Sequence, residues 1–195
     1  MTESDFLAAL TPVADCFEAL GVRYYVTGSL ASSAHGIARA SLDVDLVAEL
    51  ESGHVESFVR CLGSGYYLPH DHIRAAVNER RSFNLIHLAT MFKVDVFVAR
   101  RRPFDAQAVD RARPQAFDAS ADARKVPVAT AEDTVLAKLE WFRRGGETSE
   151  RQWWDIVGVL KVARDGDRVH LRLWADALGV ADLLERALAE ADEQP

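Results

Sequence analysis

The stretch from Gly28 to Leu46, GSLASSAHGIARASLDVDL, follows a short apolar run and ends in two aspartates, Asp43 and Asp45. Successive side chains of a β-strand point to opposite faces, so a strand here places both carboxylates on one face of a sheet. Two carboxylates this close repel each other unless a positive charge lies between them. Oxygen ligands at this spacing suit a hard divalent cation such as Mg²⁺.

A third carboxylate stands in the later segment KVDVFV, residues 93–98. Its valines alternate as the buried face of a strand, so Asp95 faces the other side. If this strand pairs beside the one that carries Asp43, three carboxylates converge on one face of the sheet. Such a set suits two magnesium ions, and a two-metal clamp stabilises both the attacking and the leaving oxygen of a phosphoryl displacement.

Gly28 and Ser29 supply the complementary part of this interpretation, a place for a phosphate group. The pair starts a helix expected at 29–35, where free backbone N–H groups and the helix dipole favour an anion. Glycine allows a close approach of the backbone, and the Ser29 hydroxyl adds a donor. Two structural interpretations stay open, because Ser29 alone is an ordinary helix cap and a pair of aspartates on a strand is also common at solvated edges.

Composition and charge narrow the class of protein. The chain has 195 residues, 49% hydrophobic and 27% charged, which suits one globular domain with or without a small helical addition. The net charge of −7 argues against non-specific binding of nucleic acid over a broad surface. No apolar run approaches the roughly 20 residues of a membrane span, and no signal peptide is evident, so we expect a cytoplasmic protein without a membrane partner. We expect Cys16 and Cys61 to be buried thiols, because a chain of this size has a core and needs no disulfide.

Hydrophobic periodicity divides the chain into an α/β core at 1–100, a linker with one short helix at 101–129, and a helical domain at 130–195. In the first part the expected helices are 3–20, 29–35, 54–62 and 71–78, and the expected strands are 24–27, 42–48, 82–88 and 92–99. The first helix is expected to restart at Pro12. In the last part the expected helices are 131–143, 150–163, 168–178 and 181–190.

In chain order, the Gly28-Ser29 pair, the Asp43/Asp45 pair and the later Asp95 resemble the signature of the polymerase-beta-like nucleotidyltransferase superfamily. The string at 28–47 is similar to a bacterial branch that includes abortive-infection toxin nucleotidyltransferases and many uncharacterised relatives. The similarity to that branch covers about residues 20–165 and extends into the helical part. The further matching residues are His35, Gly36, Arg39, Glu132, Asp133, Lys138, Arg151 and Asp155.

This resemblance implies a nucleotidyltransferase core, with a small mixed β-sheet flanked by helices, and a C-terminal helical bundle. It implies a magnesium-dependent enzyme that moves a nucleotidyl group from a nucleoside triphosphate such as ATP to an acceptor hydroxyl. Asp43 and Asp45 would ligate the two metal ions, and Asp95 would complete one metal site and orient the acceptor. The acceptor would be RNA such as tRNA, a protein or a small molecule, and a toxin of this branch would have an antitoxin partner.

The predicted nucleotide-binding residues, besides Gly28 and Ser29, each keep a second interpretation. Arg39 is either a surface charge or a contact to the triphosphate. Lys138 either extends to solvent or reaches the phosphates. Asp155, on a largely apolar helix, needs a positive partner, for which Arg151 and Lys138 are the candidates.

The remaining alternatives concern whole surfaces and the whole protein. We interpret His35 as a helix-end residue and the Trp153-Trp154 pair as core rather than as a platform for stacked bases. The arginine run RRRP at 100–103 is either a solvated face or part of a groove for RNA. The alternative function is a non-catalytic module that senses a nucleotide or docks a partner through the same fold.

Overall fold

The structure is a computed structural model that describes residues 3–36, 43–118 and 123–193 of the chain. The chain divides into two compact units, Met1–Leu30 with Ala40–Val128 and Ala31–Arg39 with Ala129–Pro195. The helix α2 (Gly28–Ala34) starts in the first unit and ends in the second. The expected α/β class with C-terminal helices is confirmed.

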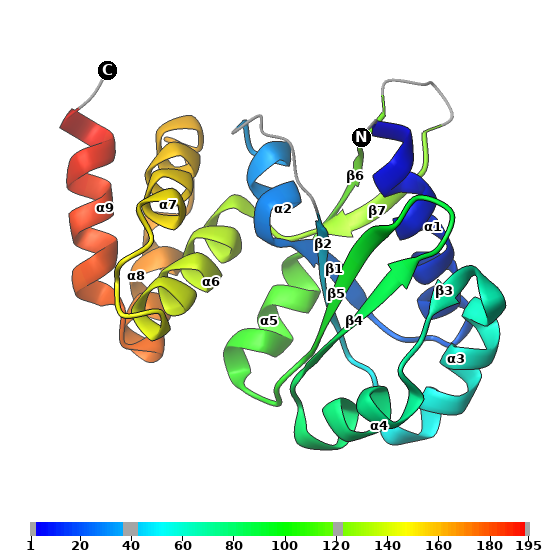
Figure 1. The fold of residues 1–195 in the computed structure, drawn as a ribbon. Coiled ribbons are helices and arrows are strands. Elements are labelled where there is room, and N and C mark those ends of the chain that lie inside the picture. Colours follow the sequence, from blue (N-terminus) through cyan, green and yellow to red (C-terminus); the bar gives the residue numbers. More distant parts are fainter. Residues whose placement is uncertain (1–2, 37–42, 119–122, 194–195) are drawn as a thin grey trace. The chain divides into compact units, whose positions relative to one another are not determined.

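The described part of the first unit is built on a seven-stranded mixed sheet in the order β3-β4-β5-β2-β1-β7-β6 (Figure 1). The strands are β1 (Tyr24–Thr27), β2 (Asp43–Ala48), β3 (Tyr66–Tyr67), β4 (Ser82–His87), β5 (Phe92–Val98), β6 (Arg113–Ala116) and β7 (Lys125–Val128). The central strands β2 and β5 run parallel, and β1 and β4 flank them in antiparallel pairs.

One face of this sheet carries the core. Side chains of β2 and β5 alternate between buried and half-buried along both strands, as predicted from the valines. The helices α1 (Glu3–Ala19) and α3 (Val55–Leu62) cover the buried face. The ring of Phe58 on α3 stacks 5.0 Å from Phe17 on α1 and lies 6.2 Å from Phe83 on β4. The half-buried side chains therefore stand on the opposite face of the sheet.

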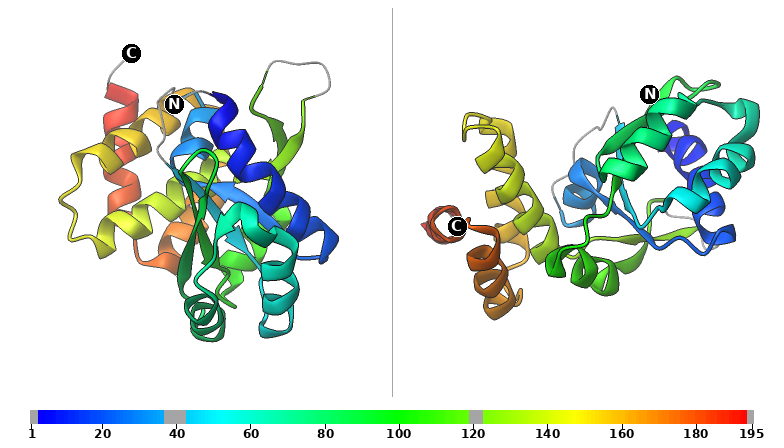
Figure 2. Two further views of the ribbon diagram at one scale, coloured as in Figure 1. Left: turned by 45° about the vertical axis from the view of Figure 1, so that its right-hand side comes forward. Right: turned by 90° about the horizontal axis from the view of Figure 1, so that it is seen from below.

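The other helices of the first unit are α4 (His70–Glu79) and α5 (Pro103–Arg111), with short 3₁₀ helices at Ser52–His54 and Gly63–Gly65. Figures 1 and 2 show α5 across the sheet from α1. The segment 101–129, expected as a linker with one helix, contains that helix and also the strands β6 and β7, which the sequence analysis did not predict. The predicted restart at Pro12 is wrong, because α1 runs through this residue without a break. The buried side chains on both sides of it, Leu10 and Val13, keep the helix packed.

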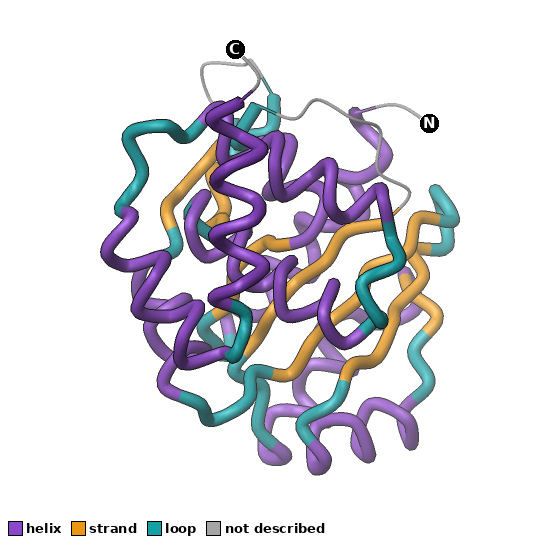
Figure 3. Tube along the Cα trace, turned by 90° about the vertical axis from the view of Figure 1, so that its left-hand side faces the viewer, coloured by secondary structure: helices purple, strands orange, loops and turns teal. Residues whose placement is uncertain are grey.

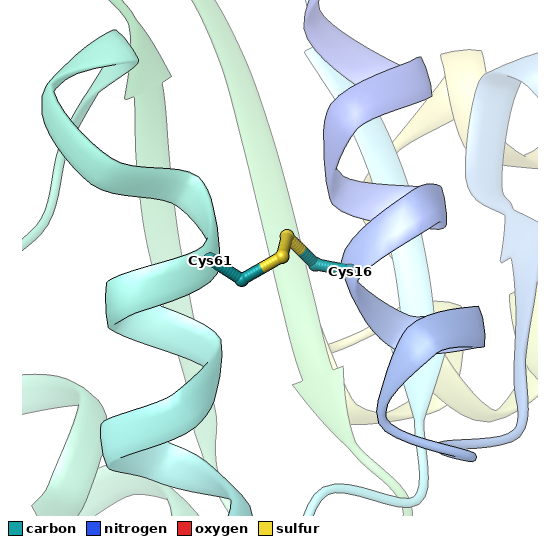
Figure 4. The surroundings of a disulfide bond; sticks show 2 residues. All are labelled: Cys16 and Cys61. Carbon is teal, nitrogen blue, oxygen red and sulfur yellow. A yellow bond between two sulfur atoms is a disulfide. The ribbon is translucent and has the colours of Figure 1, made fainter.

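A disulfide joins Cys16 on α1 to Cys61 on α3 (Figure 4). The prediction of two thiols is therefore wrong. The two Cα atoms lie 5.9 Å apart, within the range that a disulfide spans, although 45 residues separate them in sequence. The cause is the packing of α1 against α3, which the stacked phenylalanine rings also show.

In the second unit the described residues after Ala129 form helices and no strand (Figures 2 and 3). The helices are α6 (Ala131–Arg144), α7 (Glu150–Val162), α8 (Arg168–Leu178) and α9 (Ala181–Glu193). The side chains of Thr130, Ser149 and Asp167 accept backbone N–H groups in the first turns of α6, α7 and α8, so local capping fixes where these helices begin. None of the helices in the described ranges is long and apolar enough to cross a membrane.

Candidate active site

The two central strands bring together the three aspartates that the sequence singles out. In the parallel pair of β2 and β5, Asp45 lies directly opposite Asp95, and Asp43 lies opposite Lys93. All three aspartates stand on the half-buried face of the sheet. The predicted pairing of the two strands is confirmed, whereas catalysis and metal binding by these residues stay predictions.

A lysine lies among these carboxylates. The Nζ atom of Lys93 is 2.6 Å from Oδ2 of Asp95 and 3.7 Å from Oδ2 of Asp43. The hydrogen bond to Asp95 raises the pKa of Lys93, burial opposes this, and the charges of Asp95, Asp43 and Asp45 raise it further. Lys93 has no expected role among the residues predicted from the sequence. The signal was present, because a residue two positions before Asp95 on a strand shares its face.

Gly28 is the residue against which the Asp45 carboxylate packs. Thr27, the last residue of β1, pairs with Asp45, so the chain turns into α2 directly beside that side chain. Gly28 has a φ of +65°, and a Cβ atom at this position would lie 1.9 Å from Oδ2 of Asp45. Glycine is therefore required twice, by its backbone conformation and by the space that the carboxylate occupies. Ser29 is buried, with 6% of its surface exposed.

The chemistry of this cluster suits a hard cation. Carboxylates provide the oxygen ligands that Mg²⁺ prefers, and Asp43 and Asp95 already hold a cation, the ammonium group of Lys93. In the part of the chain that the structure describes, no group of three or more His, Cys, Asp or Glu side chains is arranged to hold a metal ion. The residues thus fit Mg²⁺ by their donor atoms, with Lys93 in competition for the same carboxylates.

In the second unit, Lys138 on α6 and Asp155 on α7 form a buried ion pair. The Nζ atom of Lys138 lies 2.9 Å from Oδ2 of Asp155, and the two side chains are only 13% and 7% exposed. Of the two partners considered for Asp155, the structure therefore selects Lys138 rather than Arg151. Because each charge neutralises the other, the loss of either one would remove an ion-pair partner from a buried charge. Nucleotide binding by Lys138 stays a prediction.

Two further residues that match the family resemblance, His35 and Arg39, have simpler outcomes. Nε2 of His35 lies 2.8 Å from the carbonyl oxygen of Ala129, so this side chain ties the end of α2 to the start of the helical part of the same unit. Its interpretation as a helix-end residue agrees with this contact. Arg39, predicted to contact the triphosphate, lies outside the described residues.

The two adjacent tryptophans of α7 differ in their surroundings. Trp153 is 8% exposed, donates its Nε1–H to Oε2 of Glu190 at 2.7 Å, and lies under the guanidinium of Arg186. Trp154 is 61% exposed. The core interpretation is therefore confirmed for Trp153 and wrong for Trp154, because neighbouring helical positions lie about 100° apart on the helix surface.

A cavity of about 680 Å³ lies at the opposite ends of the central strands, beyond the last residues of β2 and β5. Its lining is rich in arginine, and these arginines are Arg23, Arg80, Arg100, Arg101 and Arg102. Arg23 pairs with Glu49, while Arg80 and Arg101 share Glu51. Arg101 of the arginine run at 100–103 thus takes part in an ion-pair network, and the solvated face and the groove for RNA both stay predictions.

The comparisons with known proteins bear on the fold. No protein-family model and no curated protein matches the sequence. The structure is similar to that of ANT(2'')-Ia in complex with adenylyl-2''-tobramycin, with a TM-score of 0.54, 10% identity and coverage of 91% of this chain and 97% of that one. A solution structure of the antibiotic-resistance factor ANT(2'')-Ia matches with a TM-score of 0.50, 12% identity and coverage of 99% and 94%. The lincomycin-bound lincosamide antibiotic adenylyltransferase LnuA matches with a TM-score of 0.47, 18% identity and coverage of 83% and 98%. The chain therefore has the fold of nucleotidyltransferases, including their C-terminal helices.

Proposed function

We propose that this protein is a magnesium-dependent nucleotidyltransferase that moves a nucleoside monophosphate from a nucleoside triphosphate to an acceptor hydroxyl. One observation carries the proposal, the register that sets Asp45 opposite Asp95 on neighbouring parallel strands, with Asp43 two residues away on the same face. Three carboxylates on one sheet face supply the oxygen donors that a cation bound to a polyphosphate substrate would need. The nucleotidyltransferase fold supports the same reaction class.

The proposed reaction is an in-line displacement at the α-phosphorus. The acceptor oxygen forms a bond to this phosphorus, the bond from phosphorus to the bridging oxygen breaks, and pyrophosphate leaves. Magnesium, when bound by Asp43, Asp45 and Asp95, would supply positive charge to the phosphate oxygens. Asp95 would orient the acceptor hydroxyl and take its proton.

The triphosphate is proposed to be held by residues outside the carboxylate cluster. Gly28 and Ser29 lie at the turn beside Asp45, where a backbone without a Cβ atom permits close approach. Arg39 and Lys138 complete the proposed set on the strength of the sequence resemblance. Lys138 would have to share its charge between Asp155 and the substrate.

Two observations point to different acceptors. The resemblance of residues 20–165 to toxin-type nucleotidyltransferases supports RNA as the acceptor and an antitoxin as a partner. The adenylylated tobramycin in the complex with ANT(2'')-Ia supports the hydroxyl of a small molecule. We propose the small-molecule hydroxyl for the first assay, because the likeness to that enzyme extends over 91% of this chain. RNA and protein pools form the other arms.

Turnover tests the proposal. The purified protein is incubated with Mg²⁺, each nucleoside triphosphate labelled at the α-phosphate, and pools of hydroxylated antibiotics, tRNA or protein. We expect transfer of the label together with release of pyrophosphate. The substitution Asp95→Asn should lower the rate about 10²- to 10⁴-fold, the usual contribution of a group that transfers a proton.

Asp71→Asn is the matched control, because this aspartate of α4 is fully exposed and contacts only Arg74 among the described charged groups. It removes the same charge and should leave the rate unchanged. If nucleotides bind but no pool accepts the label, the alternative of a non-catalytic nucleotide-sensing module is correct. Growth arrest on expression that disappears with Asp45→Asn would assign the toxin-type role.

A further inference from the structure

One ammonium group, that of Lys93, contacts two of the three carboxylates. Lys93 lies opposite Asp43 in the register of β2 and β5, and it precedes Asp95 by two residues on the same strand. Its Nζ atom therefore reaches both, at 2.6 Å from Asp95 and 3.7 Å from Asp43. A divalent cation bound by these two carboxylates would compete with the ammonium group for their oxygen atoms.

The residues directly opposite these positions on the flanking strands carry no charge. Asn84 of β4 lies opposite Asp95, and Ile86 lies opposite Lys93. On the other side, Thr27 of β1 lies opposite Asp45. Among the residues that pair directly with these positions in the described strands, Lys93 is the one that carries a positive charge.

We propose that Lys93 is a positioning residue of the cation site, a built-in counter-ion that a divalent metal displaces. In the metal-free protein it holds Asp43 and Asp95 against their mutual repulsion. When metal enters, the ammonium leaves the carboxylates, and the work of moving it lowers the affinity for metal. This inference rests on the metal site of the proposed function, but it concerns metal binding and not turnover.

The positive charge of Lys93 decides whether its loss strengthens or weakens metal binding. Replacing Lys93 by methionine keeps the length of the side chain and removes one positive charge that the metal would otherwise displace. Two unit charges about 4 Å apart interact strongly near a protein surface, and here the exposed fractions of 41%, 36% and 20% for Lys93, Asp43 and Asp95 reduce that strength. We expect Lys93→Met to bind a divalent cation about tenfold more tightly.

A titration with Mn²⁺ tests this, with free Mn²⁺ followed by electron paramagnetic resonance in the absence of nucleotide. Lys125→Met is the matched control, because this exposed lysine at the start of β7 loses the same charge in the same unit. Lys93→Met should gain about tenfold in affinity, whereas Lys125→Met and the charge-preserving Lys93→Arg should stay within about twofold of the parent. Equal affinity of Lys93→Met and the parent, or an equal gain in Lys125→Met, overturns the proposal.

Thermal unfolding gives an independent measurement. Without metal, Lys93→Met should melt below Lys125→Met, because it loses the contacts of the ammonium group with Asp95 and Asp43, and Mn²⁺ should raise its midpoint more than that of the parent. If Lys93→Met does not fold, Lys93→Gln replaces it in both experiments. If the double variant Lys93→Met/Asp95→Asn binds Mn²⁺ as tightly as Lys93→Met does, then Asp95 does not bind the metal. Failure of the transferase assay would leave these binding results standing, so the two proposals fail separately.

Discussion

The substitution Gly28→Ala tests whether Gly28 fixes the position of the Asp45 carboxylate. Its effect on the transfer rate is compared with its effect on the melting temperature. A Cβ atom at this position would lie 1.9 Å from Oδ2 and 2.7 Å from Cγ of Asp45. To bring the shorter distance to 3.0 Å, the carboxylate has to move by more than about 1 Å. A misplacement of this size at a reacting centre costs about 100-fold in rate, and we expect such a loss of transferase activity.

The same substitution also has a cost in stability. A residue other than glycine at a φ of +65° loses about 1–2 kcal/mol in the left-handed conformation. For a chain of this length each kcal/mol lowers the melting temperature by about 2–4 °C, so the backbone conformation alone accounts for a fall of about 2–8 °C, and the displacement of Asp45 adds to it. Most molecules therefore stay folded at assay temperature, and unfolding does not explain a hundredfold loss.

Gly21→Ala is the control that isolates the carboxylate contact. Gly21 has nearly the same φ, +66°, but no atom lies within 4 Å of the added Cβ. It should show only the conformational fall in melting temperature, about 2–8 °C, with the parent rate of pyrophosphate release. If Gly28→Ala retains the parent rate, or loses no more activity than Gly21→Ala, then Gly28 does not fix the position of Asp45.

Three further predictions concern stability. Replacing Lys138 by Met should destabilise the protein by about 3–5 kcal/mol in urea unfolding, because Asp155 is left charged and buried, and the double variant Lys138→Met/Asp155→Leu should recover part of that loss. Reduction of the disulfide between α1 and α3, which closes 45 residues of chain, should cost about 2–4 kcal/mol, and a variant with both cysteines replaced by serine should not respond to the reductant. Hydrogen bonds from Arg80 and, against the effect of burial, from Arg101 hold the pKa of Glu51 below its usual 4.5. Since the charged form is the one stabilised, this contribution is present above pH 4.5 and is lost as the pH falls through the lowered pKa. The Glu51 side chain is 46% exposed, so Glu51→Gln should cost about 0–1 kcal/mol near pH 7, and the difference should shrink as the pH falls through the lowered pKa of Glu51.

Local patterns predicted much of the fold. The alternation of apolar residues in β2 and β5 placed the aspartates on one face, and the helical periodicity after Thr130 placed α6 to α9 within a few residues of their bounds. These signals arise from neighbours along the chain, where the spacing alone decides which face is buried. No such alternation of apolar residues predicted the strands β6 and β7. Each strand has only four residues, and one residue in each strand is a proline.

Contacts between distant segments were the part that the sequence left open. The disulfide depends on α1 and α3 lying side by side, and nothing in the two short sequences around the cysteines fixes that. The partner of Asp155 likewise depended on how α6 packs against α7, since Arg151 on its own helix satisfied the local rule equally well. In both cases the structure has a contact between segments distant in sequence that neighbouring residues alone did not predict.

The role of Lys93 shows how a single register decides the chemistry of this face. A shift of β5 by two residues would set Asp95 opposite Asp43 and carry Lys93 beyond the start of β2, away from the carboxylate pair. The alternating valines of β5 satisfy either register, because both keep the apolar face buried. The observed register places Asp95 against Asp45 and therefore Lys93 against Asp43. The same two-residue spacing that groups the aspartates thus also brings in their counter-ion, and a cation site of this kind has to be interpreted across paired strands rather than along one motif.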